Sequence, residues 1–347
     1  MSVILAIIVV LIVRGSALSG ENSDYMSKES TDGVRGLFVI LIFMSHYVEY
    51  IRTGPYDQFY LAFRSHMDQA VVIPFLFYSG YGMAIQLEKH GSGYLKKLIS
   101  RKIPGLFVKF ACSVACFLIL WLCLGKVYPL KQVLLSFVAW DSIGNSNWYV
   151  FGIIGECLIF YISYIFFSLG NGLEKKSAKI LGVVFNLLLT LAFIIGLKYM
   201  GKTRHWYNTL LMFPLGVVWA NLKNKFTLSR KWGWMPALLF SLVIYRISFL
   251  HRSSGLKWFT VWCVAFLSVC LLLTVVIRLD GALIRFCARH VFSIYILQRL
   301  PMIILTHFGW TKSSPYISFV ICACATCLIA IAFDNLSQRV GKKVGGR

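Results

Sequence analysis

Ionisable side chains inside apolar stretches are the residues of this sequence best suited to chemistry. Arg35, His46 and Glu49 share one such stretch, "VRGLFVILIFMSHYVEY". Ionisable groups are costly in a membrane-spanning helix and usually have a function there. The 11-residue spacing between Arg35 and His46 is about three helical turns plus roughly 20°. The two side chains are therefore predicted to face the same side of one helix.

An imidazole at this position could act as a general base. A histidine in a polar pocket can take a proton from a sugar hydroxyl. Glu49, one turn after His46, could orient its ring. The helical rise between Arg35 and His46 is about 16 Å, roughly half the thickness of the hydrocarbon core. We therefore expect Arg35 at the cytoplasmic mouth and His46 nearer the outer face. The alternative is that His46 only hydrogen-bonds a neighbouring helix.

Two other segments contain groups that suit a phosphate-bearing ligand and its path. The segment "GYLKKLISRKIPGLF" places Lys97, Arg101 and Lys102 shortly before a proline. Such a cluster can bind the phosphates of a nucleotide-bearing donor, or equally anionic lipid headgroups. In "VIPFLFYSGYGMAIQLE", Ser79 and Gly80 reduce side-chain bulk. This indicates either a wide place where a ligand passes or ordinary close packing of helices.

A fourth segment, "GNSNWYVFGIIGECLIFY", begins with groups that suit a carbohydrate. The amides of Asn145 and Asn147 match sugar hydroxyls, and the indole of Trp148 matches the face of a sugar ring. Trp is also the usual anchor at a membrane interface, which is the alternative. We expect these three residues at the external mouth, where they would bind an acceptor.

Deeper polar residues need partners. Glu156 lies about two turns into the same apolar run, and a buried carboxylate requires a polar neighbour. Gln298 and Arg299, in "VFSIYILQRLP", are also predicted to be buried polar partners. Arg299 could pair with a carboxylate or with an acyl donor. The cysteines within 322–327 have no His or carboxylate beside them, so we expect no metal site there.

The elements that must position these groups are apolar helices. The chain has 347 residues, of which 58% are apolar and 14% charged, whereas soluble domains average roughly 45–50% and about 25%. The excess lies in blocks of about 17–24 residues, which is the length of a membrane-spanning helix. The sequence predicts an all-α polytopic membrane bundle with about ten transmembrane helices, preceded by a short apolar helix over residues 2–13. The expected spans are 35–51, 67–88, 104–124, 147–170, 180–199, 206–222, 234–250, 257–278, 290–309 and 315–333.

Domain organisation and orientation follow from the same pattern. We expect a short helix and juxtamembrane loop at 1–34, one transmembrane domain at 35–333 and a basic tail at 334–347. The formal net charge is +22. In a membrane protein such charge sets orientation, because Lys and Arg accumulate in cytoplasmic loops; nucleic acid is not an expected partner. The side that holds residues 89–103 is the more basic. That side and the C-terminus are predicted to be cytoplasmic, in a multi-pass protein of the cell membrane, with residues 125–146 external.

Four segments together resemble the acyltransferase-3 family of multi-spanning bacterial acyltransferases. The likeness is greatest to the branch found with capsule and exopolysaccharide genes. It covers about residues 27–301. The segments are "SKESTDGVRGLFVILIFMSHY", "FLFYSGYGMAIQLEKHGSGYLKKLISRKIP", "GNSNWYVFGIIGECLIFY" and "HVFSIYILQRLP", with a weaker fifth in "LLMFPLGVVWA".

Two motifs of the family can be placed residue by residue. The family's Arg and His of the first helix match Arg35 and His46. The family usually shows two arginines three apart before the proline of the basic stretch. The second matches Arg101, but the first falls on Leu98, and the adjacent Lys97 is the basic residue available in its place. This departure bears on the detailed donor contacts.

The resemblance implies an O-acetyltransferase with ten spanning helices. Its donor would be acetyl-CoA, a substrate rather than a bound cofactor, and its acceptor a hydroxyl of an envelope or exported polysaccharide or a lipid-linked glycan. Membrane lipid is the remaining expected partner. The alternative is a transporter or flippase of lipid-linked sugar, in which the same buried charges would line a translocation path. That alternative predicts inverted repeats, and the sequence shows no convincing internal repeat.

Overall fold

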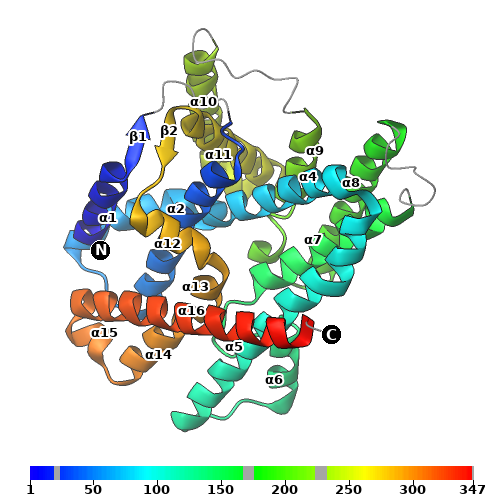
Figure 1. Cartoon of the computed structure of the whole chain (residues 1–347). Helices are drawn as coiled ribbons and strands as arrows, with labels where there is room; N and C mark the ends of the chain where they lie inside the picture. Colours follow the sequence, from blue (N-terminus) through cyan, green and yellow to red (C-terminus); the bar gives the residue numbers. More distant parts are fainter. Residues whose placement is uncertain (19–23, 167–175, 223–232, 346–347) are drawn as a thin grey trace.

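The computed structural model describes residues 1–18, 24–166, 176–222 and 233–345, with side chains to residue 339, and these ranges are mainly α-helical (Figure 1). The last two residues of the predicted basic tail, and parts of two basic loops, lie outside the described residues. The helices are α1 (Ser2–Arg14), α2 (Lys28–Tyr47), α3 (Gln58–Met67), α4 (Ile73–Lys97), α5 (Ile103–Cys123), α6 (Leu130–Phe137), α7 (Trp148–Ile165), α8 (Lys176–Tyr199), α9 (Met212–Leu222), α10 (Trp234–His251), α11 (Leu256–Val276), α12 (Ala282–Arg289), α13 (Val291–Leu297), α14 (Arg299–His307), α15 (Trp310–Ser313) and α16 (Pro315–Gly345).

The predicted all-α polytopic bundle is confirmed. Among the described residues, seven helical stretches are long and apolar enough to cross a membrane. One of them, Pro55–Cys123, contains both α4 and α5, which are two of the expected spans. Two other expected spans correspond to shorter apolar helices, α9 and the pair α13–α14. Each of the ten expected spans therefore contains a helix.

Helix α2 begins earlier than the apolar pattern predicted. Residues 28–34 were expected in a loop, yet the helix starts at Lys28. The Ser27 hydroxyl accepts a hydrogen bond from the Ser30 amide at 3.2 Å, which satisfies one of the free N–H groups of the first turn. This cap is independent of hydrophobic periodicity, so an apolar block could not reveal it. Arg35 consequently lies about two turns inside the helix.

The N-terminal segment is attached to the rest of the bundle by a small sheet. Strand β1 (Ser16–Leu18) pairs antiparallel with β2 (Ile277–Leu279), with Ala17 opposite Arg278. Leu5 and Ile8 of α1 are buried. Figure 1 shows α1, β1, β2 and α12 together on one side of the molecule. The sheet therefore joins the start of the chain to the junction of α11 and α12.

Glycines bring α4 and α9 into backbone contact. A Cβ added at Gly80 would lie 2.1 Å from the Phe213 carbonyl oxygen, and one added at Gly216 would lie 2.0 Å from the Phe77 oxygen. Small residues at helix crossings allow such close approach in membrane proteins. The Phe-Pro-Leu-Gly stretch in α9 thus has a packing role, and α4 is fixed against α9.

Two interruptions shape the polar regions. The π-helical turn η4 (Leu98–Lys102) separates α4 from α5 and contains Arg101. The expected span 290–309 is divided into α13 and α14 at Gln298. Pro301 has no N–H to donate to the Leu297 carbonyl, which accounts for the break.

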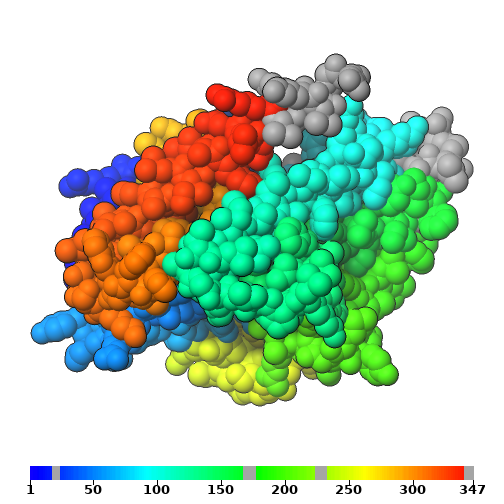
Figure 2. All heavy atoms as spheres, turned by 90° about the horizontal axis from the view of Figure 1, so that it is seen from below, coloured from blue at the N-terminus to red at the C-terminus, as the bar shows by residue number. Residues whose placement is uncertain are grey.

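The C-terminal helix α16 packs on both α13 and α14. On the face seen in Figure 2, the α14–α16 segment lies beside α5 and α6. An ion pair of 3.4 Å between Lys109 of α5 and Asp334 of α16 joins these two groups of helices. Helix α14, which carries Arg299, is therefore held between α16 and α2, with which it is also in contact.

Candidate active site

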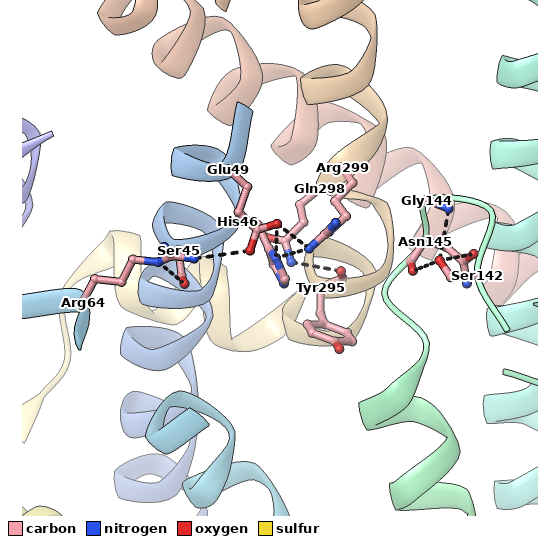
Figure 3. Close-up of polar contacts among 10 residues, drawn as sticks. All are labelled: Ser45, His46, Glu49, Arg64, Ser142, Gly144, Asn145, Tyr295, Gln298 and Arg299. Atoms are coloured by element: carbon pink, nitrogen blue, oxygen red, sulfur yellow. Dashed lines mark hydrogen bonds and ion pairs between the residues drawn. The ribbon is translucent and has the colours of Figure 1, made fainter. Parts of the chain in front are cut away.

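A polar cluster around His46 joins elements that are far apart in the sequence (Figure 3). His46 lies in the last turn of α2, Glu49 in the 3-10 turn that follows (Val48–Tyr50), and Arg299 at the start of α14. Arg299 Nη2 is in hydrogen-bonding contact with His46 Nδ1 and donates to Glu49 Oε2 at 2.9 Å. Glu49 Oε2 lies 3.8 Å from His46 Nδ1. The predicted neighbours His46 and Glu49 therefore share Arg299 as a partner.

A second guanidinium binds the same carboxylate. Arg64, on α3, donates from Nη2 to Glu49 Oε1 at 3.3 Å and from Nε to Ser45 Oγ at 3.1 Å. The sequence did not single out Arg64, because it lies in a polar segment that was expected to be an external loop. Its spacing from α2 in the sequence gives no sign of this contact.

The contact with Arg299 restricts the protonation of His46. A guanidinium has N–H donors and no acceptor, so His46 Nδ1 must accept in this arrangement. In the neutral ring the proton is then on Nε2. Glu49 is the neighbouring group that could hold a proton on Nδ1 instead. If Glu49 took the place of Arg299 as the partner of Nδ1, the ring proton would lie on Nδ1. Nε2 would then be free to accept a proton.

Unpaired polar atoms lie next to this cluster. The side chains of Tyr295 and Gln298 are buried, and the Gln298 amide donates to the Tyr295 backbone oxygen at 3.1 Å. Among the described residues, the Tyr295 hydroxyl, Gln298 Oε1 and Arg299 Nε make no hydrogen bond of good geometry, although the side chain of Ser146 is near Tyr295 and that of Tyr50 is near Arg299. Buried polar atoms are normally paired, so this group suggests that a ligand completes it. The four-residue spacing of Tyr295 and Arg299 could have revealed Tyr295 from the sequence.

The predicted acceptor residues lie in and after the loop before α7. A Cβ added at Gly144 would lie 3.4 Å from the side chain of Ile303, so this loop packs against α14. Asn145 Oδ1 accepts from the Ile143 amide at 3.0 Å, while its Nδ2 is buried and has no partner among the residues that the structure describes. Asn147 Nδ2 donates to the backbone oxygens of Ala139 and Asp141. Asn147 thus holds the loop, and Asn145 keeps a free donor.

Trp148 lies beside a second ring. Its indole meets His205 edge-on, with ring centroids 5.6 Å apart, and it also contacts Tyr149. Burial lowers the pKa of His205, which favours its neutral form. The role of Trp148 in binding an acceptor stays a prediction.

The basic residues of the predicted donor site are exposed. Lys97, Arg101 and Lys102 all lie at the junction of α4, η4 and α5. Lys102 Nζ donates to the Tyr94 hydroxyl at 3.1 Å. In the described part of the chain, Lys97 and Arg101 take part in no ion pair. Their charges are therefore available to an anion.

Arg35 occupies a separate position from His46. Its guanidinium pairs with Asp32 at 3.3 Å and lies 5.8 Å from the centre of the Tyr78 ring on α4. Both Arg35 and His46 lie on α2, as predicted, but no direct contact joins them. Ser79, next to Tyr78, is half-buried and its donor role stays a prediction. Gly80 does not line a passage, because the backbone of α9 fills the space beside it.

Glu156 has its own partner on another helix. It is fully buried, and its Oε2 accepts from Thr190 Oγ1 of α8 at 2.9 Å. Arg299 pairs with Glu49 and not with Glu156. The described residues contain no group of three or more His, Cys, Asp or Glu side chains that could hold a metal ion.

Comparison with known proteins identifies the family. The chain matches the acyltransferase domain of the acyltransferase-3 family over residues 28–334, which is nearly its whole length. No curated protein and no solved structure matches it. The matched region includes α2 with its histidine, the basic turn η4 and α14. The helical bundle with several candidate membrane spans is consistent with this match. The chain therefore belongs to the acyltransferase-3 family of membrane acyltransferases.

Proposed function

We propose that the protein transfers an acetyl group from acetyl-CoA to a hydroxyl of an envelope or exported polysaccharide, or of its lipid-linked precursor. The observation that supports this most is the cluster of His46, Glu49 and Arg299. A histidine that is 17% exposed, next to a carboxylate and unpaired donors, suits proton transfer from a hydroxyl. The family supplies the acyl-transfer chemistry, and the resemblance to its capsule and exopolysaccharide branch supports the acceptor class.

The proposed reaction balances without a net proton. The acceptor oxygen attacks the thioester carbon while its proton passes to His46 Nε2. The C–S bond then breaks, and the thiolate of CoA takes up the proton from the imidazolium. The negative charge on the carbonyl oxygen needs donors during this step. The Tyr295 hydroxyl and the Arg299 guanidinium are the nearby groups that could provide them.

The donor would bind from the opposite end of the bundle. Lys97 and Arg101 are exposed and form no ion pair within the described ranges, so they can bind the phosphates of CoA. Lys102 is beside them, and Arg35 lies on α2 between this end and His46. The narrow pantetheine arm would carry the thioester inward. Acylation of an external sugar would then not require CoA to cross the membrane.

Glu49 would control whether His46 can act as a general base. In the present arrangement Arg299 blocks Nδ1, and the base is formed when Glu49 takes over that nitrogen. Glu49 Oε2 already lies 3.8 Å away, so a small movement of Arg299 toward a substrate would suffice. Binding of substrate and activation of the base would in this way be linked.

The test is His46→Ala in the full-length protein. Removal of a general base typically lowers the rate by about 10²–10⁴. The variant should insert normally and bind CoA, yet fail to place base-labile acyl groups on purified surface polysaccharide, normalised to enzyme in the membrane. His90→Ala, exposed near the end of α4, is the matched control and should remain active. Near-normal acylation by well-expressed His46→Ala would refute the proposed role of His46.

A further inference from the structure

The charges around His46 do not balance. Two guanidiniums, Arg64 and Arg299, share the single carboxylate of Glu49. Among the described residues no other carboxylate is within ion-pair distance of either arginine; Asp68 interacts with Arg252 and with Arg64, but with Arg64 only from beyond that distance. With His46 neutral, the cluster carries one uncompensated positive charge. Arg64 is 35% exposed and Arg299 22%, so water only partly screens that charge.

In the described part of the chain, the unpaired polar atoms near Arg299 and in the 141–147 loop are mainly donors. Arg299 Nε and Asn145 Nδ2 can only donate, and the hydroxyls of Ser146 and Tyr295, which interact with each other, leave one hydroxyl proton to donate. The Ser146 hydroxyl lies beside the Tyr295 hydroxyl, which connects the acceptor loop to α13. Gln298 Oε1 is the one unpaired atom of this group that can only accept. These groups can donate hydrogen bonds to the oxygens of an anionic ligand.

The loop that carries Asn145 also has cations on its borders. Lys202 Nζ lies 3.8 Å from the centre of the Trp140 ring and 4.0 Å from that of Trp206. Lys126 Nζ lies 4.6 Å from the Trp121 ring centre, and Trp121 donates to the Ile143 carbonyl. These two cations add positive charge beside the loop, which Asp141 offsets in part at Lys202.

We infer that the substrate group bound at the His46 cluster carries a carboxylate. This inference rests on the proposed acyl transfer and names the chemistry of one partner. The carboxylate has two possible sources: a uronic acid in the acceptor saccharide, or the free end of a dicarboxylic acyl group on CoA. In either case it binds Arg64 or Arg299 and takes no part in the bonds that form and break. By competing with Glu49 for Arg299, it also helps to release His46 Nδ1.

The test compares four substrate pairs with the unaltered full chain in nanodiscs, where both faces are open. Acetyl-CoA and succinyl-CoA are each supplied with a neutral hexose oligosaccharide and with its hexuronate counterpart. A charged hydrogen bond is worth about 1.5–3 kcal/mol, or roughly a 10- to 150-fold effect. At least one acidic pair should therefore exceed the neutral pair in kcat/KM by about tenfold or more. Preference across the two acceptors identifies the saccharide as the source, and preference across the two donors identifies the acyl group.

Arg64→Gln should reduce this preference toward unity, whereas Arg64→Lys should keep part of it because the charge remains. Lys257→Gln, an exposed external cation, is the control and should leave the preference unchanged. Equal use of the neutral and acidic pairs by the unaltered chain would overturn the inference while leaving acyl transfer intact. Absence of transfer in all four pairs, from protein that still binds CoA, would count against the proposed function and the inference together.

Discussion

Glu49→Gln tests whether the His46 cluster works as a unit. The substitution keeps the size of the side chain and removes the charge that accepts from Arg299 at 2.9 Å and from Arg64 at 3.3 Å. A buried charged hydrogen bond contributes about 1.5–3 kcal/mol, and an exposed ion pair about 0–1 kcal/mol. Because the Glu49 side chain is 42% exposed, we expect a loss of interaction energy between these two values. We expect about 1–2 kcal/mol for the two bonds together, or a roughly 5- to 30-fold loss of turnover.

The assay is initial-rate acyl transfer by purified protein in nanodiscs, with donor and acceptor varied separately. The fall should appear in kcat, while KM for acyl-CoA stays unchanged because Glu49 is remote from the basic turn η4. Glu88→Gln is the matched control, since Glu88 also pairs with a cation, Lys179, at 3.0 Å but is 59% exposed. It should retain turnover within about twofold. Turnover of Glu49→Gln within threefold of the unaltered protein, or an equal loss in Glu88→Gln, would show that the carboxylate does not control His46.

Three further predictions concern the donor site, the packing and the orientation. Lys97→Gln and Arg101→Gln should raise KM for acyl-CoA, with a smaller difference from the unaltered protein at high salt because screening weakens exposed charge contacts; unchanged donor binding would instead identify a lipid-binding cluster. Gly80→Ala should lower stability in a detergent thermal-denaturation assay by about 1–3 kcal/mol, since the added Cβ meets the rigid Phe213 backbone. Gly82→Ala on the same helix meets no atom of the described residues within 4 Å and should be neutral or stabilising. In intact cells an impermeant thiol reagent should label Val127→Cys and not Ser92→Cys, and the reverse pattern would invert the predicted orientation.

The apolar pattern of the sequence was enough to predict the class of fold. Blocks of about 20 apolar residues are hard to place anywhere but in membrane helices, because a lipid environment requires every backbone polar group to be paired within the segment. The placement of Arg35 and His46 on one helix follows from their spacing alone. The same is true of Glu49, which is close to His46 because it follows it by one turn. These are local properties of the chain, fixed by helical geometry.

The apolar pattern predicted the boundaries of the helices less accurately than the class of fold. The Ser27 cap extends α2 to Lys28, and Pro301 divides the span 290–309. Both effects depend on single hydrogen bonds of the backbone. The mean hydropathy of a block of residues does not reveal such bonds. The sequence suggested that Ser79 and Gly80 either line a passage or allow close packing. For Gly80, only the position of α9 decided the question in favour of packing.

The pairing of buried charges was decided by the tertiary structure. The sequence predicted that Arg299 pairs with a carboxylate or with an acyl donor, but it did not indicate which carboxylate. Because α14 packs against α2, Arg299 is hydrogen-bonded to Glu49. Because α7 packs against α8, Glu156 is hydrogen-bonded to Thr190. Arg64 joined the cluster only because α3 returns to the end of α2. Helical periodicity determines which face a side chain occupies, but its partner depends on which distant helix packs against that face.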